Sequence, residues 1–304
     1  MFIAVAIMAC SIASPQDKVE FKMGDGEVDV LIGGDPFATV HYADRSRPYV
    51  YPVYGPTGAQ MLRNYPFIEG VEGESSDHPH HTGVWFAHGD MNGVDMWHQK
   101  GSMTVRAKPQ LTGPSITLVL NMRDSEGVIF GQCTQRLTFG TSGESARFID
   151  YDILLAPIAG GSLVFGDTKE GMMGVRTHPN LRLDRPGGNV LNSEGVSGPQ
   201  VWGRRAAWID YWGTIDGEVV GIAMFDHPKN PRHPTWWHAR EYGLFAANPF
   251  GVFEFEDKPP GTGDMQLGVD EKVRFRYRLL FHTGTAKSAV IDEQYRTWAD
   301  GEKD

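Results

Sequence analysis

Apolar and polar residues alternate one by one along much of this 304-residue chain. Because successive side chains of a β-strand point to opposite faces, a period of two predicts half-buried strands. The alternating stretches are residues 28–32, 37–42, 115–122, 128–139, 146–155, 219–225 and 272–281. Clusters of turn-forming residues separate them, for example at 33–36 and 187–189. The pattern predicts an all-β fold in the form of a large antiparallel β-sandwich.

One segment has a different periodicity. From Thr285 to Trp298, residues recur at four-residue spacing with no Gly or Pro between them, which predicts a C-terminal helix packed on the sandwich. Sandwiches of about 200–250 residues commonly form one unit. The best candidate for a linker, Pro259 to Gly263, is followed at once by renewed alternation and is better explained as a hairpin loop. We therefore expect residues 14–304 to form a single domain.

The amino terminus has the features of an export signal. Residues 2–13 are apolar and end in Ser11-Ile12-Ala13, a small-x-small pattern that a signal peptidase cuts. We expect residues 1–13 to be a signal peptide and the protein to be periplasmic or extracellular. A buried terminal strand is the main alternative, and a lipoprotein acylated on Cys10 is a minor one. Cys133 lies in an alternating apolar run and should be a buried, unpaired thiol.

Charge and composition narrow the classes of partner. The formal net charge of -10 argues against nucleic acid, because binding to phosphates requires a basic face. No stretch after Ala13 is long and apolar enough to span a membrane. The chain has 37 Gly and 19 Pro residues for turns, and 8 Trp, 10 Tyr and 16 Phe residues that can also line a pocket. A small-molecule or oligosaccharide ligand fits this composition.

Five of the 11 histidines fall within 21 residues of one another, and carboxylates and indoles accompany them in residues 76–98. The five are His78, His80, His81, His88 and His98. A residue before proline favours an extended backbone, so His78 should be extended and share a face with His80, opposite His81. Gly83 permits a bend that would bring His81 and His88 towards a common point.

Such a cluster suits either metal binding or acid–base chemistry, because imidazole is a common metal ligand and titrates near neutrality. No HExxH motif, zinc-finger spacing or EF-hand loop is present. The metal hypothesis therefore rests on histidine richness alone. It places one divalent ion on His80, His178 and His227.

Three further segments combine charged and aromatic residues. Residues 226–240 contain repeated His-Pro pairs, tryptophans and arginines that suit a polar, ring-shaped ligand. Residues 166–178 contain Glu170, the preferred carboxylate partner for a histidine. Arg204 and Arg205 precede Trp208 in a fourth mixed patch. Each segment is open to a plainer explanation as a braced or solvated surface loop.

Together these segments resemble a bacterial family of unknown function that also carries the label "methane oxygenase PmoA". The matching blocks are SDHPHHTGVWFAHGDMNGVDMWH, GDTKEGMMGVR, GRRAAWIDYWG and GIAMFDHPKNPRHPTWWHAREYGLFAANPFG. The label conflicts with the sequence, since a membrane oxygenase subunit needs long apolar spans. The resemblance implies an exported protein of saccharide-degrading bacteria, with a supersandwich similar to that of galactose mutarotase.

The leading hypothesis is an enzyme that acts on a sugar or sugar acid by proton transfer between histidine and carboxylate groups, with or without a metal. Lyase, epimerase and hydrolase chemistry all fit. The expected catalytic residues are His81, His88 and Glu170. The expected substrate-binding residues are Trp85, Asp90, Trp97, His98, Arg176, Arg205, Trp237 and His238. The alternatives are a non-catalytic saccharide-binding module, which would use the indoles, and a structural envelope protein.

Overall fold

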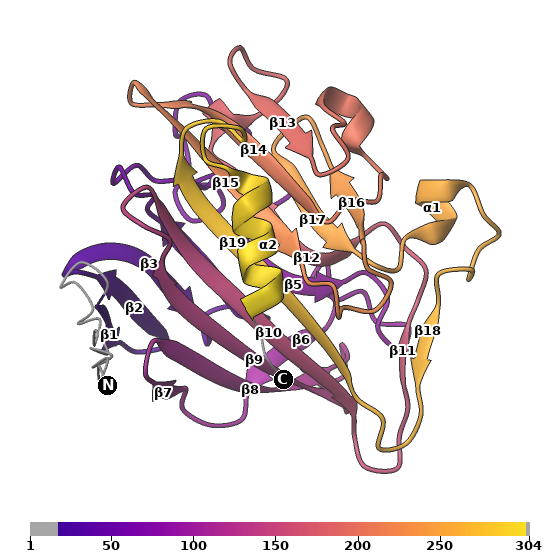
Figure 1. Ribbon diagram of the computed structural model, residues 1–304. Helices are drawn as coiled ribbons and strands as arrows, with labels where there is room; N and C mark the ends of the chain where they lie inside the picture. Colours follow the sequence, from indigo (N-terminus) through magenta and orange to yellow (C-terminus); the bar gives the residue numbers. More distant parts are fainter. Residues whose placement is uncertain (1–17, 302–304) are drawn as a thin grey trace, which may run out of the picture.

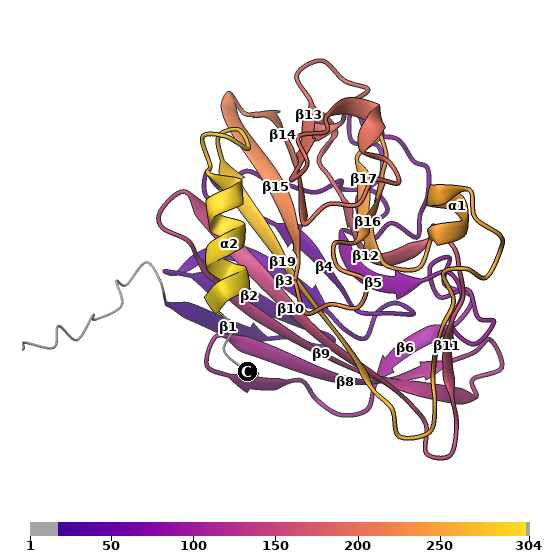
Figure 2. The same ribbon diagram turned by 45° about the vertical axis from the view of Figure 1, so that its right-hand side comes forward.

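The computed structural model describes residues 18–301 and consists mainly of two large antiparallel sheets (Figures 1 and 2). The eight-stranded sheet has the order β1 (Val19–Met23), β2 (Glu27–Ile32), β3 (Asp35–His41), β4 (Tyr49–Val53), β5 (Val84–His88), β12 (Gly171–Arg176), β17 (Leu244–Asn248) and β16 (Trp236–Ala239). The predicted all-β class and sandwich are confirmed. The predicted leader, residues 1–13 with Cys10, lies outside the described residues.

The nine-stranded sheet packs against the first. Its order is β13 (Asn189–Asn192), β14 (Trp208–Ile215), β15 (Glu218–Asp226), β19 (Val273–Thr283), β10 (Ala146–Pro157), β9 (Ile129–Thr141), β8 (Ser115–Arg123) and β6 (Ser102–Val105), with β7 (Gln110–Thr112) paired to β8. A two-stranded sheet pairs β11 (Leu163–Phe165) with β18 (Met265–Leu267). Short 3-10 turns lie at η2 (Pro179–Leu181) and η3 (Gly198–Val201).

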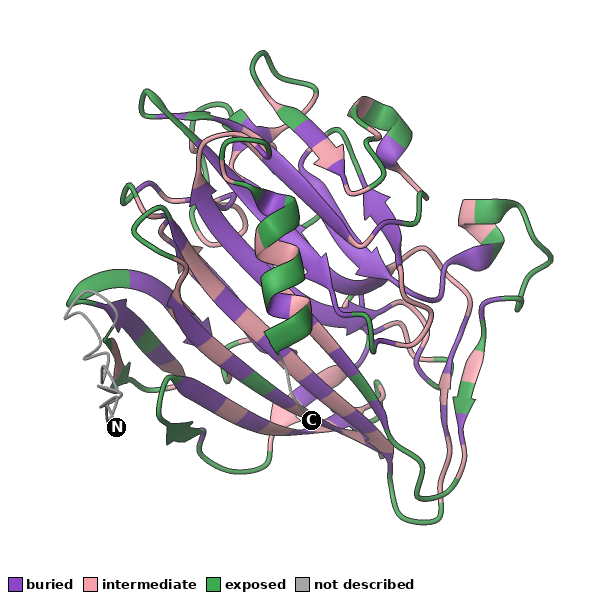
Figure 3. Ribbon diagram, in the orientation of Figure 1, coloured by how far each residue is buried: buried purple, intermediate pink, exposed green. Residues whose placement is uncertain are grey.

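Aromatic rings from both sheets meet in the interior. Phe37 of β3 makes edge contacts with Phe139 and Phe281 of the opposite sheet, at centroid distances of 6.1 and 6.0 Å. Figure 3 shows the resulting alternation of buried and partly exposed residues along β9 and β10. Burial of these rings removes apolar surface from water and accounts for the tight packing of the two layers.

The C-terminal helix α2 (Ile291–Gly301) lies across the outer face of the nine-stranded sheet (Figure 1). Ile291 and Trp298 are buried against Trp208 and Phe225 there. The helix is confirmed, but the predicted start at Thr285 is wrong. Residues 286–290 form a turn, and Val290 has a left-handed φ of 47°, which a continuous helix does not allow. A second helix, α1 (Val252–Glu256), was not predicted.

Register across the eight-stranded sheet fixes the face on which each site residue lies. Trp85 pairs with Gly174, Gly174 with Ala246, and Ala246 with His238. These four positions share the face that points away from the second sheet. The neighbouring row has the opposite orientation, as shown by Phe245, which stacks on Tyr211 of β14 at 4.8 Å. The outer face, beneath the loop that precedes β5, carries the candidate site.

Candidate functional site

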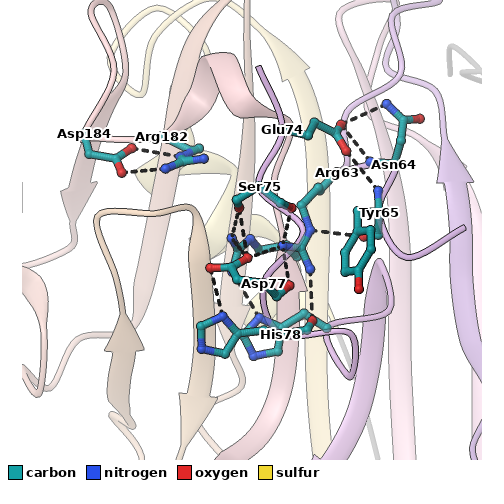
Figure 4. A network of polar contacts seen from close by, with 11 residues as sticks. Arg63, Asn64, Tyr65, Glu74, Ser75, Asp77, His78, Arg182 and Asp184 are labelled. Carbon is teal, nitrogen blue, oxygen red and sulfur yellow. Dashed lines mark hydrogen bonds and ion pairs between the residues drawn. The ribbon is translucent and has the colours of Figure 1, made fainter. Parts of the chain in front are cut away.

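Asp77 anchors the loop that leads into β5 (Figure 4). Its Oδ1 accepts hydrogen bonds from Nη1 of Arg63 at 2.6 Å and Nη2 of Arg176 at 3.0 Å, and also from the Ser75 hydroxyl. Burial alone would raise the pKa of Asp77, but the Arg176 charge and the Ser75 and His78 contacts hold that pKa well below its usual range. Asp77 is therefore a fixed carboxylate. It leaves its second oxygen for His78.

His78 and Asp77 form a first dyad. His78 Nδ1 lies 2.9 Å from Asp77 Oδ2, and because an ionised carboxylate only accepts, Nδ1 carries the proton. The Nε2 lone pair is then available, on a side chain that is 40% exposed. The expectation of an extended His78 is wrong, since its φ is +46°. This left-handed backbone turns the imidazole towards the outer face of the sheet.

Four nearly parallel rings form a column that includes His78. Tyr242 stacks on His78 at 5.4 Å, His78 on His81 at 4.8 Å, and His81 on Trp85 at 5.2 Å. The predicted separation of His78 from His81 is therefore wrong. A local turn, with His81 N donating to the His78 carbonyl, replaces the strand on which that prediction depended.

His81 is buried at the centre of the column, and its protonation is set by Arg176. Arg176 Nη1 lies 3.1 Å from His81 Nδ1. A guanidinium has no acceptor, so His81 Nδ1 must accept and the ring proton must be on Nε2. Burial, followed by the nearby His80 and Arg176, lowers the pKa of His81 well below its ordinary value. His81 is a neutral hydrogen-bond donor in this arrangement and does not offer a base at Nε2.

His98 and Asp95 form a second dyad. His98 Nδ1 donates to Asp95 Oδ2 at 2.8 Å, which leaves Nε2 free on a side chain that is also 40% exposed. His80 lies between the two dyads, 5.6 Å from the His78 ring and 4.4 Å from the His98 ring. We call His78, His80, His81 and His98 the imidazole cluster. Its two outer members each have a carboxylate behind them and a free nitrogen.

Unsatisfied polar atoms concentrate around the imidazole cluster. The buried atoms without a protein hydrogen-bond partner include His80 Nε2, Thr82 Oγ1, Trp85 Nε1, Trp97 Nε1 and Arg176 Nε. Such atoms are few in native proteins, and each implies an ordered water, an ion or a functional role. His238 Nδ1, at the far end of the same face, is another such atom. The group around the imidazole cluster is a place where polar ligand atoms can be accommodated.

Glu170 contributes a carboxylate beside the second dyad. It follows Lys169, whose Nζ lies 3.7 Å from Glu170 and 2.6 Å from Glu254. Burial raises the pKa of Glu170, and the nearby Lys169 and His98 oppose that rise. The predicted partnership of Glu170 with a histidine therefore has a candidate in His98. Among the residues that the structure describes, no hydrogen bond joins the Glu170 and His98 side chains.

His88 is not brought to the imidazole cluster. Its ring faces the sandwich interior, where it contacts Phe250 at 4.8 Å and its Nε2 donates to the Gly166 carbonyl at 2.7 Å. Burial lowers the pKa of His88 to about 4. The bend at Gly83 precedes β5, and strand geometry then directs Trp85 and His88 to opposite faces. The arrangement gives His88 a supporting role.

The predicted substrate-binding residues divide into two groups. Arg176, His98, Trp85 and Trp97 lie in or against the imidazole cluster, although both indoles are fully buried and form a wall rather than an open platform. His238 lies on the same face, at the far end of its row.

The other three predicted binding residues have structural partners. Trp237 is buried on the interior face and donates to the Ala206 carbonyl. Arg205 donates to the carbonyls of Pro234 and Arg232. Asp90 accepts from the Gly93 amide within a turn.

The three histidines proposed as metal ligands do not form one set. His178 Nδ1 accepts from the Asn180 amide and begins η2, and His227 Nδ1 accepts from the Lys229 amide. His80 lies in the imidazole cluster. Within residues 18–301, no group of three or more His, Cys, Asp or Glu side chains is arranged to hold a metal ion.

Sequence reasoning did not select four residues that the fold brings together: Arg63, Asp77, His78 and Tyr242. The sequence does contain a local signal for both dyads, because a carboxylate precedes each histidine closely. Asp77 is directly before His78, and Asp95 is three residues before His98. Arg63 and Tyr242 reach the site from distant segments. No local pattern identifies them.

Comparison with known proteins gives a family and a set of distant folds. The sequence profile described as "Family of unknown function (DUF6807)" matches residues 27–296. No curated protein matches the chain significantly. The methane-oxygenase label has no support in these findings, and no helix within residues 18–301 is long and apolar enough to cross a membrane.

Similar solved structures include a galactose mutarotase related enzyme from Lactobacillus acidophilus, with 11% identity, a TM-score of 0.38, and coverage of 88% of this chain and 98% of that one. A galactose 1-epimerase from Lactobacillus acidophilus NCFM has 9% identity, a TM-score of 0.39 and coverage of 90% and 100%. A 4-alpha-glucanotransferase from Thermococcus litoralis has 9% identity, a TM-score of 0.32 and coverage of 89% and 40%. At these values the likeness assigns neither substrate nor reaction to this chain.

Proposed function

The chain belongs to the DUF6807 family of unknown function, and we propose that it is an enzyme that acts on a sugar or sugar acid by proton transfer at the imidazole cluster. The observation that carries the proposal is the pair of carboxylate-backed imidazoles, Asp77–His78 and Asp95–His98. A carboxylate on Nδ1 fixes the tautomer, so Nε2 is ready to take a proton from a substrate.

Two such groups on one site allow one to act as base and the other as acid. His78 and His98 are each in contact with His80, so their rings are no farther apart than the sum of the two separations from it. A sugar ring with its hydroxyl groups fits within that upper limit. An epimerase removes a proton from one face of such a ring and returns a proton to the other face. A lyase combines proton removal with protonation of a leaving oxygen.

The remaining residues bind and position the ligand in this proposal. His81, held neutral by Arg176, presents Nε2–H as a donor to a hydroxyl or carbonyl oxygen. Glu170 is a second acid–base candidate next to His98. The burial of Trp85, Trp97 and Trp237 disfavours the alternative of a saccharide-binding module, which needs exposed indole faces.

The test is turnover on a panel of monosaccharides, uronic acids and oligosaccharides, followed by proton NMR. For a substrate found in this way, His78→Gln and His98→Gln should each reduce kcat by about 10²–10⁴-fold. His41→Gln, a half-buried histidine of β3 outside the cluster, serves as the matched control and should keep full activity. Turnover that survives both cluster substitutions would overturn the proposal.

A further inference from the structure

The interior of the site collects positive charge, although the chain as a whole has a formal net charge of -10. Three guanidinium groups are buried behind the imidazole cluster: Arg47, Arg63 and Arg176. Arg63 and Arg176 share a single carboxylate, Asp77. In the described part of the chain, Arg47 donates only to the backbone carbonyls of His80, Met96 and Trp97. Buried cations therefore outnumber the carboxylates bound to them.

Burial of a charge without a counter-charge is costly. Backbone carbonyls that accept from Arg47 and Arg63 offset part of this cost, and an anionic ligand would offset more of it. The pKa of the neighbouring His80 reflects this positive charge. The pKa of His80 falls to about 3, first because of burial and then because of the nearby His98 and Arg47. Elsewhere on the same face, burial and then the nearby Arg240 and Lys169 lower the pKa of His238 to about 3.

A fourth guanidinium, that of Arg240, lies at the open end of the ring column. Its Cζ is 5.7 Å from the centroid of Tyr242, and Arg176 approaches the same ring at 4.6 Å. The backbone amide of Arg240 donates to the carbonyl of Leu244 in β17, and Leu244 is also the strand partner of Arg176 in β12. The two arginines therefore lie on either side of Leu244. Arg240 is exposed, and within residues 18–301 its side chain has no hydrogen bond or ion pair.

The contrast with the other arginines of this region is informative. Arg205 uses its guanidinium to brace two backbone carbonyls, and Arg182 is paired with Asp184 at 2.6 Å. Glu170, the carboxylate on the His98 side of the cluster, already has Lys169 beside it. Arg240 alone among these groups offers an uncommitted fork of donors. Such a fork matches the two oxygens of a carboxylate.

We propose that Arg240 binds a carboxylate of the substrate, so that the site takes a sugar acid in preference to the neutral sugar of the same stereochemistry. This inference rests on the proposed function, because it assigns the substrate class of the same site. The buried guanidiniums favour the anion from below, and Arg240 holds it at the rim. The sugar ring then extends from Tyr242 across His78 towards His98.

The test compares three matched pairs by isothermal titration calorimetry at low ionic strength: D-glucuronate with D-glucose, D-galacturonate with D-galactose, and D-mannuronate with D-mannose. For at least one pair the acid should bind ten times or more tightly than the neutral sugar. Arg240→Gln should bring that ratio close to one. Arg136→Gln, an exposed arginine of β9 in the other sheet, should leave it unchanged.

The outcomes separate the two proposals. Equal binding of acid and neutral sugar, or a preference that survives in Arg240→Gln, would overturn the carboxylate assignment and leave the proton-transfer site intact. No binding of any of the six sugars, together with no turnover on the wider panel, would overturn both. Because Arg240 is exposed and unpaired, its substitution should not affect folding, which thermal unfolding checks.

Discussion

Arg176 donates from Nη1 to His81 Nδ1 across 3.1 Å, and both side chains are almost completely buried. This contact joins the floor of the site, on β12, to the loop that carries the dyads. It fixes the tautomer of the central ring of the column. The same guanidinium also binds Asp77. Arg176 therefore determines the tautomer of His81 directly, and it holds the Asp77 carboxylate that determines the tautomer of His78.

Arg176→Met should destabilise the protein by about 2–4 kcal/mol, because it removes a buried partner from Asp77 and leaves His81 Nδ1 without a donor. The free energy of unfolding in urea measures the effect. Arg136→Met, on the exposed face of β9, is the control and should cost less than about 0.5 kcal/mol. A loss as small as that of the control would show that the contact does not contribute to the fold.

Gly174→Ala should damage the wall of the site without introducing a polar group. A Cβ at this position would lie 2.8 Å from Trp85 Cε2 and 3.1 Å from Trp97 Cη2, and two packed indoles cannot both move aside. Overpacking of this kind costs about 1–3 kcal/mol. Gly301→Ala has no atom within 4 Å of the added carbon and is the matched control. Equal unfolding free energies for the two variants would contradict the packing described.

Asp77→Asn should reduce kcat by about 10²-fold or more and change KM less, since Asp77 orients His78 and does not touch the substrate. The amide can offer a donor to Nδ1 and so favour the wrong tautomer. Because Asp77 also neutralises two buried arginines, folding is checked by circular dichroism. Ser75→Ala, which removes one hydrogen bond to the same Oδ1, is the milder companion and should lower kcat by a smaller factor. A change confined to KM would place Asp77 in binding instead.

The stability of the protein should fall as the pH decreases from about 6.5 to about 4, in part because of His88. Burial lowers the pKa of His88 to about 4 in the folded state, against about 6.5 in the unfolded chain. In this window the unfolded chain binds a proton that the folded state does not, so unfolding is favoured, by about 3 kcal/mol in all.

His88→Gln tests that contribution. The amide can still donate to the Gly166 carbonyl but cannot take up a proton, so the dependence of unfolding free energy on pH should become flatter between about pH 6.5 and 4. Denaturant unfolding at several pH values gives the slope. An identical slope for wild type and variant would show that His88 does not contribute to it.

Alternation predicted the long strands well because each has one face in the core and one in water, as β9 and β10 show. It did not detect the strands beneath the site. Every residue of β5, β12, β16 and β17 is buried, because loops cover the outer face of that part of the sheet. Strands buried on both faces have no period of two, so the floor of the site was invisible to this signal.

The histidine-rich segment located the site, but its internal geometry depended on contacts from elsewhere. The left-handed backbone of His78 and its stacking on His81 follow from the anchoring of Asp77 by Arg63 and Arg176, which are distant in sequence. Strand geometry explains why the prediction for His88 was wrong. The sequence predicted that His81 and His88 lie in one cluster, but alternation of side chains along β5 directs His88 to the interior face of the sheet.

The most direct test of the account is a crystal structure of the protein with the sugar acid that binds most tightly. We predict that the ligand lies over the ring column, with its atoms about 2.6–3.2 Å from Nε2 of both His78 and His98. A ligand bound elsewhere, for example in the apolar hollow between Trp208 and the start of α2, with both of those nitrogens untouched, would contradict it.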